Sequence, residues 1–228
     1  LRISGVEGDA HEAASRGLKP GEWGAWQGWI RMLDKAGQSS ASFVHLMEDD
    51  VDISDMFLSL VQDDLLRGLL DRQKVACTDA YVSPRQCLAM LNALDQAKRD
   101  GRQWLEISSG LRIPCLNSLL LTPEVARRLG RELQAALRKG NLLRAVDVEL
   151  AEVFSDWITI APFVTSPKLS LASLGATRAN TEDAPLFSRD ALTLLRRVLF
   201  CKADDPDLKV GLADLMIQLA DLGVLRPY

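Results

Sequence analysis

Short apolar runs alternate with amphipathic stretches from the start of the chain to about residue 167. The runs have the length of buried strands, and the amphipathic stretches repeat apolar residues every three or four positions, as helices do. This alternation is typical of helices packed on a sheet, so we expect an α/β fold. Residues 166–183 are rich in Ser, Thr, Ala and Gly, which predicts a loop, and amphipathic patterns after it predict two helices, at 188–201 and 206–222. We therefore expect a main domain over residues 1–184 and a small helical subdomain over residues 185–228.

Helix starts are marked by capping residues and by proline at the first helical position. Pro20 opens a helix whose tryptophans, Trp23, Trp26 and Trp29, we expect mainly in the core. The other signals predict helices over residues 54–69, with Ser54 as N-cap, over 84–99, closed at Gly101, and over 123–139. In the helix over 84–99 we expect Leu88, Leu91 and Leu94 to face inward.

Strands are predicted over residues 41–47, 74–81, 103–108, 115–121 and 157–161. The first of these is a nearly continuous apolar run, typical of a strand buried on both faces. His45 interrupts it, and we interpret this residue as a core histidine with its hydrogen bonds satisfied rather than as a ligand.

The charge and cysteine content narrow the class of protein. A net charge of -4 over 228 residues argues against a partner bound mainly through its phosphates, so we expect no nucleic-acid ligand. The four cysteines are scattered without metal-binding spacing, which favours a reducing compartment. The sequence shows neither a long apolar run nor a charged and apolar leader, so we expect neither a membrane span nor a signal peptide, and a cytoplasmic location.

Four acids fall within five positions directly after the first strand: Glu48, Asp49, Asp50 and Asp52. The carboxyl ends of strands are where ligands bind in open α/β sheets. In an extended chain Glu48 and Asp50 lie on one side and Asp49 on the other. Two convergent carboxylates repel each other unless a cation sits between them, and Mg²⁺ or Mn²⁺ would also bind a diphosphate. Alternatively, these acids cap the next helix, with Asp52 and Ser54 doing only that.

With its surroundings, this cluster resembles glycosyltransferase family 25, the lipopolysaccharide-biosynthesis type. That family has a Leu-x-Pro-Gly-Glu-x-Gly helix start followed by a strand ending in Glu-Asp-Asp. The matching residues are Leu18, Pro20, Gly21, Glu22 and Gly24 in the first motif and Glu48, Asp49, Asp50 and Val51 in the second. Residues 117–133 and 145–164 also look like later segments of the family. A Ser-His pair that members usually carry is replaced here by Gln27 and Gly28.

The resemblance implies a GT-A-like, Rossmann-type mixed sheet flanked by helices, with a helical C-terminal appendage. It implies inverting transfer of a sugar, often galactose, from a uridine diphosphate donor to a glycan or lipid-linked glycan acceptor in bacterial surface polysaccharide assembly. Such an enzyme works in the cytoplasm, where peripheral association with the inner face of the membrane is an option. By analogy Glu48, Asp49 and Asp50 meet the donor, and Glu48 and Asp50 hold Mn²⁺ or Mg²⁺.

The acceptor hydroxyl needs a carboxylate base. Asp147 is our candidate, with Glu149 behind it. An equally good interpretation is that Asp147 serves only as the N-cap of its helix.

Two other functions stay open. A degenerate transferase domain could serve as a scaffold or glycan-binding module, which the Gln27-Gly28 departure favours. A Mg²⁺-dependent phosphohydrolase could use the same acids, but no basic cluster or glycine-rich phosphate loop lies near them in the sequence.

Overall fold

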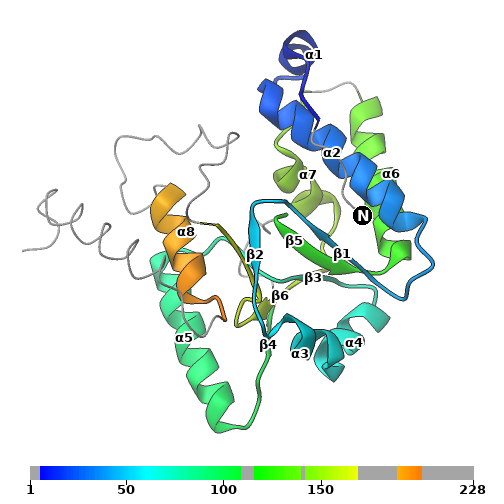
Figure 1. Cartoon of the computed structure of the whole chain (residues 1–228). Coiled ribbons are helices and arrows are strands. Elements are labelled where there is room, and N and C mark those ends of the chain that lie inside the picture. Colours follow the sequence, from blue (N-terminus) through cyan, green and yellow to red (C-terminus); the bar gives the residue numbers. More distant parts are fainter. Residues whose placement is uncertain (1–5, 109–115, 140–141, 169–188, 202–228) are drawn as a thin grey trace, which may run out of the picture.

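A computed structural model of the chain describes residues 6–108, 116–139, 142–168 and 189–201. The predicted helix over 206–222 and the predicted domain boundary at residue 184 lie outside these residues. Most of the predicted loop over 166–183 also lies outside them, but its first two residues belong to a strand, Thr165–Pro167, and not to a loop. Figure 1 shows helices on both faces of a central sheet, which confirms an α/β fold. In chain order the elements are α1 (Ala10–Ser15), α2 (Pro20–Gly37), β1 (Val44–Met47), β2 (Val51–Ile53), α3 (Phe57–Gln62), α4 (Asp64–Asp71), β3 (Val75–Cys77), α5 (Pro84–Arg99), β4 (Leu105–Ser108), β5 (Ser118–Leu121), α6 (Pro123–Arg138), α7 (Val146–Val153), β6 (Trp157–Ala161), β7 (Thr165–Pro167) and α8 (Arg189–Val198).

The central sheet is mixed, with five strands in the order β1-β5-β3-β6-β4. Both β1 and β3 pair antiparallel with β5, and β3 pairs parallel with β6. Strands β1, β3 and β6 therefore run in one direction, and β5 and β4 run in the other. It follows that the carboxyl ends of β1 and β3 and the start of β5 meet at one edge of the sheet. A separate ribbon of β2 and β7 continues from that edge.

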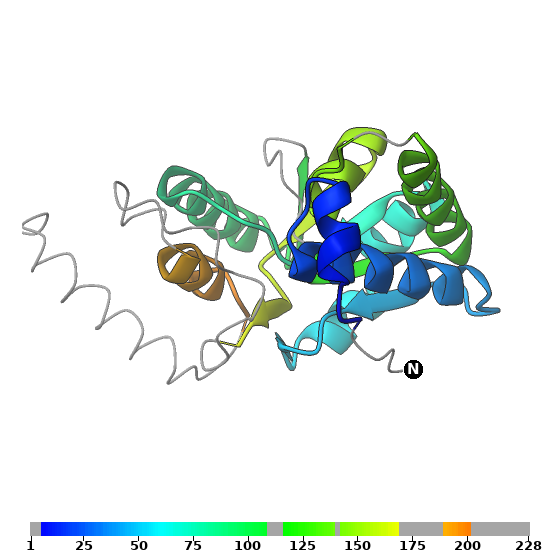
Figure 2. The ribbon, with the colours of Figure 1, turned by 90° about the horizontal axis from the view of Figure 1, so that it is seen from above.

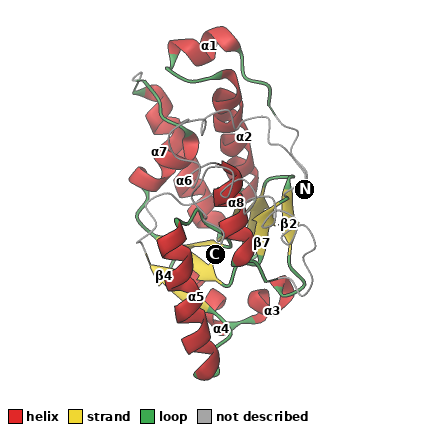
Figure 3. Cartoon of the chain, turned by 90° about the vertical axis from the view of Figure 1, so that its left-hand side faces the viewer, coloured by secondary structure: helices red, strands yellow, loops and turns green. Residues whose placement is uncertain are grey.

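Side-chain alternation along the strands divides the core between the two faces of the sheet. Leu119 and Leu121 of β5 pack with α2, α6 and α7 on one face, whereas Leu120 packs with α3 and α4 on the other. Helices α5 and α8 form a third cluster around Phe163, beside the sheet. Figures 1 and 2 both show α5 and α8 next to each other and apart from α2 and α6, and Figure 3 shows this pair from its own side.

The capping signals place most helix starts correctly. Pro20, Pro84 and Pro123 each occupy the first position of a helix, as predicted. Ser83 forms a capping box with Gln86, and α5 ends just before Gly101, whose φ is +71°. A positive φ is a conformation that glycine adopts without steric cost, so its position fixes where this helix stops.

The helix predicted over 54–69 is wrong in its boundaries. The chain forms β2 first and then two short helices, α3 and α4, which are separated at Asp63. Asp63 accepts a hydrogen bond from the Leu65 backbone N–H and thereby caps α4. Ser54 is not a helix N-cap: its hydroxyl accepts from the Met56 N–H in a turn before α3. The apolar spacing could not show this break because both helices face the same side of the sheet.

The inward face of α5 was also predicted wrongly. Leu88 is 61% exposed and Leu91 is 37% exposed. Cys87 and Met90 are buried in their place, one position earlier in each case, and Ala97 is also buried. Leu94 packs against the same cluster, so the prediction was correct for this residue. The prediction favoured leucines for their hydrophobicity, whereas the side of α5 that packs in the cluster with α8 carries Cys87 and Met90.

The three tryptophans of α2 are buried, which confirms the core interpretation. Trp26 donates its indole N–H to the Arg144 carbonyl at 2.7 Å, so its polar atom is satisfied. Among the described residues, no helix has the length and apolar character that crossing a bilayer requires.

Two glycines of α2 should respond in opposite directions to substitution by alanine. A Cβ at Gly24 would lie 2.2 Å from the Val6 carbonyl oxygen, whereas a Cβ at Gly28 meets nothing within 4 Å. We expect Gly24→Ala to destabilise the protein by about 1–3 kcal/mol through overpacking against backbone. Gly28→Ala should stabilise it by roughly 0.5–1 kcal/mol, because alanine is the better helix former. Urea denaturation of both variants measures this, and equal shifts of the two midpoints would contradict it.

Candidate active site

The candidate site lies where the carboxyl ends of β1 and β3 meet the start of β5. Glu48 directly follows β1, Thr78 and Asp79 follow β3, and Asn117 precedes β5. The backbone ties the edge together, because the Glu48 N–H donates to the Asn117 carbonyl at 2.9 Å. The topology therefore brings acids from two separate parts of the chain to one place, where α/β sheets commonly bind ligands.

Glu48 is partly buried and lies among other charged groups. Burial, reinforced by the neighbouring Asp50 and Asp79 carboxylates, raises the pKa of Glu48 from its ordinary 4.5 to about 7. The Arg196 guanidinium and a hydrogen bond from Trp29 act in the opposite direction on this pKa. Of the three buried tryptophans of α2, Trp29 is therefore the one that contacts Glu48. Near neutral pH, Glu48 holds its proton about half of the time.

Asp50 and Asp49 differ in their surroundings. One carboxylate oxygen of Asp50, Oδ1, is buried and has no hydrogen-bond partner among the described residues. Residues 49 and 50 form a turn rather than the predicted extended strand, but Asp50 still lies close enough to Glu48 to raise its pKa, and Asp49 is exposed. Lys168 holds this turn: its N–H donates to the Asp50 carbonyl at 2.8 Å and its Nζ to the Asp49 carbonyl at 3.3 Å.

Asn117 bridges the acids to a buried arginine. With its amide oriented to satisfy both neighbours, it donates from its side-chain nitrogen to Glu48 Oε2 at 3.2 Å and accepts from Arg196 Nη2 at 2.9 Å. Arg196 also donates to Asp79 Oδ2. Both side chains of this ion pair are almost fully buried, at 1% and 0% exposure.

The next residue of α8, Arg197, reaches the ribbon of β2 and β7. Its Nη1 lies 2.7 Å from Asp52 Oδ2 and 3.3 Å from the Pro167 carbonyl oxygen. Asp52 was predicted as a possible helix cap, but the structure shows that it instead forms an ion pair with α8. Two consecutive arginines of α8 therefore neutralise acids from β2 and from the end of β3.

A chain of buried hydroxyl groups lies beside these acids. Thr165 Oγ1 is 2.7 Å from Thr78 Oγ1, Thr78 donates to Ser118 Oγ at 2.6 Å, and Ser118 Oγ is 2.6 Å from His45 Nε2. Burial lowers the pKa of His45 to about 4, so its ring is neutral at ordinary pH. The ring also stacks on Phe57, with centroids 4.7 Å apart. The structure confirms that His45 has a hydrogen-bond partner, but the side chain is partly buried rather than in the core.

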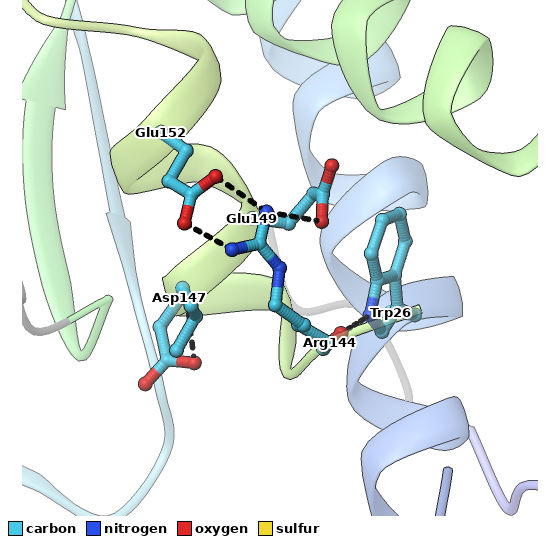
Figure 4. A network of polar contacts seen from close by, with 6 residues as sticks. Trp26, Arg144, Asp147, Glu149 and Glu152 are labelled. Carbon is cyan, nitrogen blue, oxygen red and sulfur yellow. Dashed lines mark hydrogen bonds and ion pairs between the residues drawn. The ribbon is translucent and has the colours of Figure 1, made fainter. Parts of the chain in front are cut away.

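The predicted base, Asp147, lies in the first turn of α7, and Ala145 rather than Asp147 is the N-cap. Its Oδ1 accepts from the Val148 N–H at 2.8 Å. Figure 4 shows the Arg144 guanidinium between Glu149 and Glu152, with the Asp147 carboxylate turned away from it. In the described part of the chain, no hydrogen bond or ion pair joins Asp147 or Glu149 to Glu48 or Asp50.

The residues at the edge fit a divalent cation in their chemistry. Mg²⁺ and Mn²⁺ sites commonly use only one or two protein carboxylates, because substrate phosphates and water supply the remaining ligands. Glu48 and Asp50 are two such carboxylates, and within the described part of the chain the buried Asp50 oxygen has no hydrogen-bond partner. The described residues contain no group of three or more His, Cys, Asp or Glu side chains arranged around one point, so a cation here would take its remaining ligands from water or from a bound phosphate.

Comparison with known proteins adds no identification. No model of a known protein family matches the chain, and no curated protein matches it. The resemblance to glycosyltransferase family 25 therefore stays a prediction that rests on the motifs themselves.

Sequence reasoning missed four residues of this site: Asp79, Asn117, Arg196 and Arg197. Asp79 had a usable signal, because it follows an apolar strand just as Glu48 does. The two arginines interrupt the apolar run TLLRRVLF, where buried positions are expected on both sides of them. Asn117 had no signal, because its role depends on a strand order that the sequence does not display.

Proposed function

We propose that this chain is a metal-dependent, inverting glycosyltransferase with a GT-A-like fold. It would move a sugar from a nucleotide diphosphate donor, with uridine diphosphate as the leaving group, to a glycan or lipid-linked glycan acceptor. Bacterial surface polysaccharide assembly at the inner face of the membrane is the proposed setting. The single observation that carries the proposal is the pair of partly buried acids, Glu48 and Asp50, at the carboxyl end of β1.

Glu48 and Asp50 are the residues that would hold Mn²⁺ or Mg²⁺. A bound cation stabilises the negative charge that grows on a diphosphate leaving group. The chain's own residues prepare this role. Asn117 and Trp29 hydrogen-bond to the Glu48 carboxylate, and Lys168 fixes the turn that carries Asp49 and Asp50.

Asp147 remains the proposed base for the acceptor hydroxyl. The residue is partly exposed, and its side chain forms no ion pair with any described residue. Glu149 is less suited to proton transfer, because it pairs with Arg144 at 3.4 Å. Arg144 therefore binds Glu149 in the first turn of α7, whereas the Asp147 side chain points away from Arg144 (Figure 4).

A second candidate is a non-catalytic, glycan-binding or scaffolding relative. It is favoured by the buried Arg196–Asp79 pair, because a built-in guanidinium already compensates part of the acidic charge at the edge. Turnover of any nucleotide sugar would exclude this second candidate.

Calorimetry with uridine diphosphate and Mn²⁺ tests the leading proposal. We expect the protein to bind the nucleotide only with Mn²⁺ present, and Asp50→Asn to weaken binding at least about tenfold by removing a cation ligand. Asp55→Asn is the matched control, because Asp55 is an exposed acid five residues further along. Removal of the metal with a chelator should abolish the binding. Absence of binding by the unmodified protein, or unchanged binding by Asp50→Asn, would refute the proposal.

A further inference from the structure

We propose that Arg196 is a positioning residue for Glu48 and acts through the side chain of Asn117. This inference rests on the proposed function for its consequence, since Glu48 is the residue proposed to bind a cation. It rests on the structure alone for its geometry. The arginine comes from α8, far along the chain, and its effect would make α8 part of the site's machinery.

Contacts other than the one with Asn117 hold the Arg196 guanidinium in place. Asp79 pairs with it on one side, and the Tyr81 ring lies 4.6 Å from its central carbon. With almost no exposure to water, the side chain has little freedom to move. A rigid donor therefore faces Asn117.

An arginine can only donate hydrogen bonds, so it selects one orientation of the asparagine amide. The Asn117 carbonyl oxygen turns to Arg196 at 2.9 Å, and its NH₂ group turns to Glu48 at 3.2 Å. The Asn117 backbone carbonyl accepts from the Glu48 N–H at 2.9 Å, which fixes the same residue at a second point. Without the arginine, the amide could flip and present an oxygen to the Glu48 carboxyl. The donor that orders Glu48 would then be lost.

Arginine suits this task better than lysine. One guanidinium nitrogen, Nη2, donates both to Asp79 and to Asn117, and its two hydrogens are held in the plane of a rigid group, whereas lysine offers a compact charge on a flexible stem. Arg196→Lys therefore keeps the charge opposite Asp79 and so favours correct folding, but it should lose the bridge to Asn117. Arg197→Lys is the matched control, because Arg197 is its equally buried neighbour and bonds to Asp52 instead.

The first experiment measures the Asn117 side chain directly. Asn117 is one of four asparagines, so labelling asparagine with ¹⁵N gives a simple NMR spectrum, and Asn117→Ser assigns the signal. We expect the Asn117 NH₂ protons to exchange with water at least about tenfold faster in Arg196→Lys and in Arg196→Met. Arg197→Lys should leave them unchanged. Wild-type exchange rates in both Arg196 variants would overturn the proposal.

The second experiment asks whether the effect passes through Asn117. Free Mn²⁺ is followed by electron paramagnetic resonance in the wild type, Arg196→Lys, Asn117→Ala and the double variant. We expect each single change to weaken Mn²⁺ binding about tenfold, as loss of an outer hydrogen bond typically does, and the double variant to bind as Asn117→Ala does. If the fold-reductions in Mn²⁺ affinity of the two single variants multiply in the double variant, Arg196 acts independently of Asn117, against the proposal. If the wild type binds no Mn²⁺ while its Asn117 amide still depends on Arg196, the positioning role stands and the proposed metal-dependent function fails.

Discussion

Glu48→Gln is expected to stabilise the protein at about pH 8 by roughly 3 kcal/mol, which raises the melting temperature by about 6–12 °C for a chain of this size. The reason is the raised pKa of Glu48, from 4.5 to about 7, caused first by burial and then by Asp50. A group with a raised pKa in the folded state stabilises the fold when it is protonated. Its contribution is complete below pH 4.5 and is lost as the pH rises through 7. Glutamine keeps the shape without the charge, so the gain should appear only at the higher pH.

Denaturation in urea at a series of pH values measures this effect. The difference between the wild type and Glu48→Gln should grow between pH 4.5 and about 7 and then level off. Taking this difference removes contributions from other groups, including His45, whose lowered pKa gives the opposite trend. Glu7→Gln, at an exposed glutamate, serves as the control and should show no such dependence. A wild type that is more stable than Glu48→Gln at about pH 8 would show that Glu48 is held as a compensated anion.

Such a gain would also bear on function. A buried acid that destabilises the fold at neutral pH is typical of a functional site, where a residue needed for activity lowers the stability of the protein. We therefore expect the stabilised Glu48→Gln variant to bind Mn²⁺ more weakly than the wild type. Stronger stability with undiminished Mn²⁺ binding would indicate that Glu48 is not a cation ligand.

Asp79→Asn should destabilise the protein by about 3–5 kcal/mol. Asp79 and Arg196 form an ion pair with almost no exposure to water, and the amide of asparagine cannot compensate the guanidinium charge that remains. The midpoint of urea denaturation reports the loss. Replacing both partners by apolar residues, Asp79→Leu with Arg196→Met, should recover most of it, because no uncompensated charge stays buried.

The Arg67–Asp64 pair provides the matched control for this experiment. Its two charged atoms lie 2.7 Å apart, but its side chains are 66% and 90% exposed. Asp64→Asn should therefore change the denaturation midpoint little, since exposed ion pairs contribute little to stability. Equal losses for Asp79→Asn and Asp64→Asn would show that the Arg196–Asp79 pair is as well hydrated as the surface pair.

Local signals in the sequence predicted several elements well, for identifiable reasons. Thr122 followed by Pro123 starts α6, and Ser83 followed by Pro84 starts α5, because caps act within a few residues of themselves. The two-helix break at Asp63 and the ribbon strand β2 were not predicted. Strand β2 pairs with β7, which lies more than a hundred residues later in the chain. The residues close to β2 in the sequence therefore carry no signal of this pairing.

The residues of the candidate site were also predicted only in part. The acids Glu48 and Asp50 were found from their position after an apolar run, and the structure places them together, with Asp49 exposed. The predicted base Asp147 lies on a separate element whose hydrogen bonds do not reach them within the described residues. Arg196 and Asn117, the residues that hold Glu48 from the other side, were not predicted.

By itself, the sequence determined where most helices begin, which residues form the apolar strands, and where acids gather after the first strand. These properties depend on neighbours within a turn or two of the chain, where backbone geometry and capping act. Only the tertiary structure decided that β5 runs between β1 and β3, that Asp79 joins Glu48 at one edge, and that α8 inserts two arginines among these acids. Charge compensation in a buried site depends on distance in space, and that distance is set by strand order and helix packing rather than by separation along the chain.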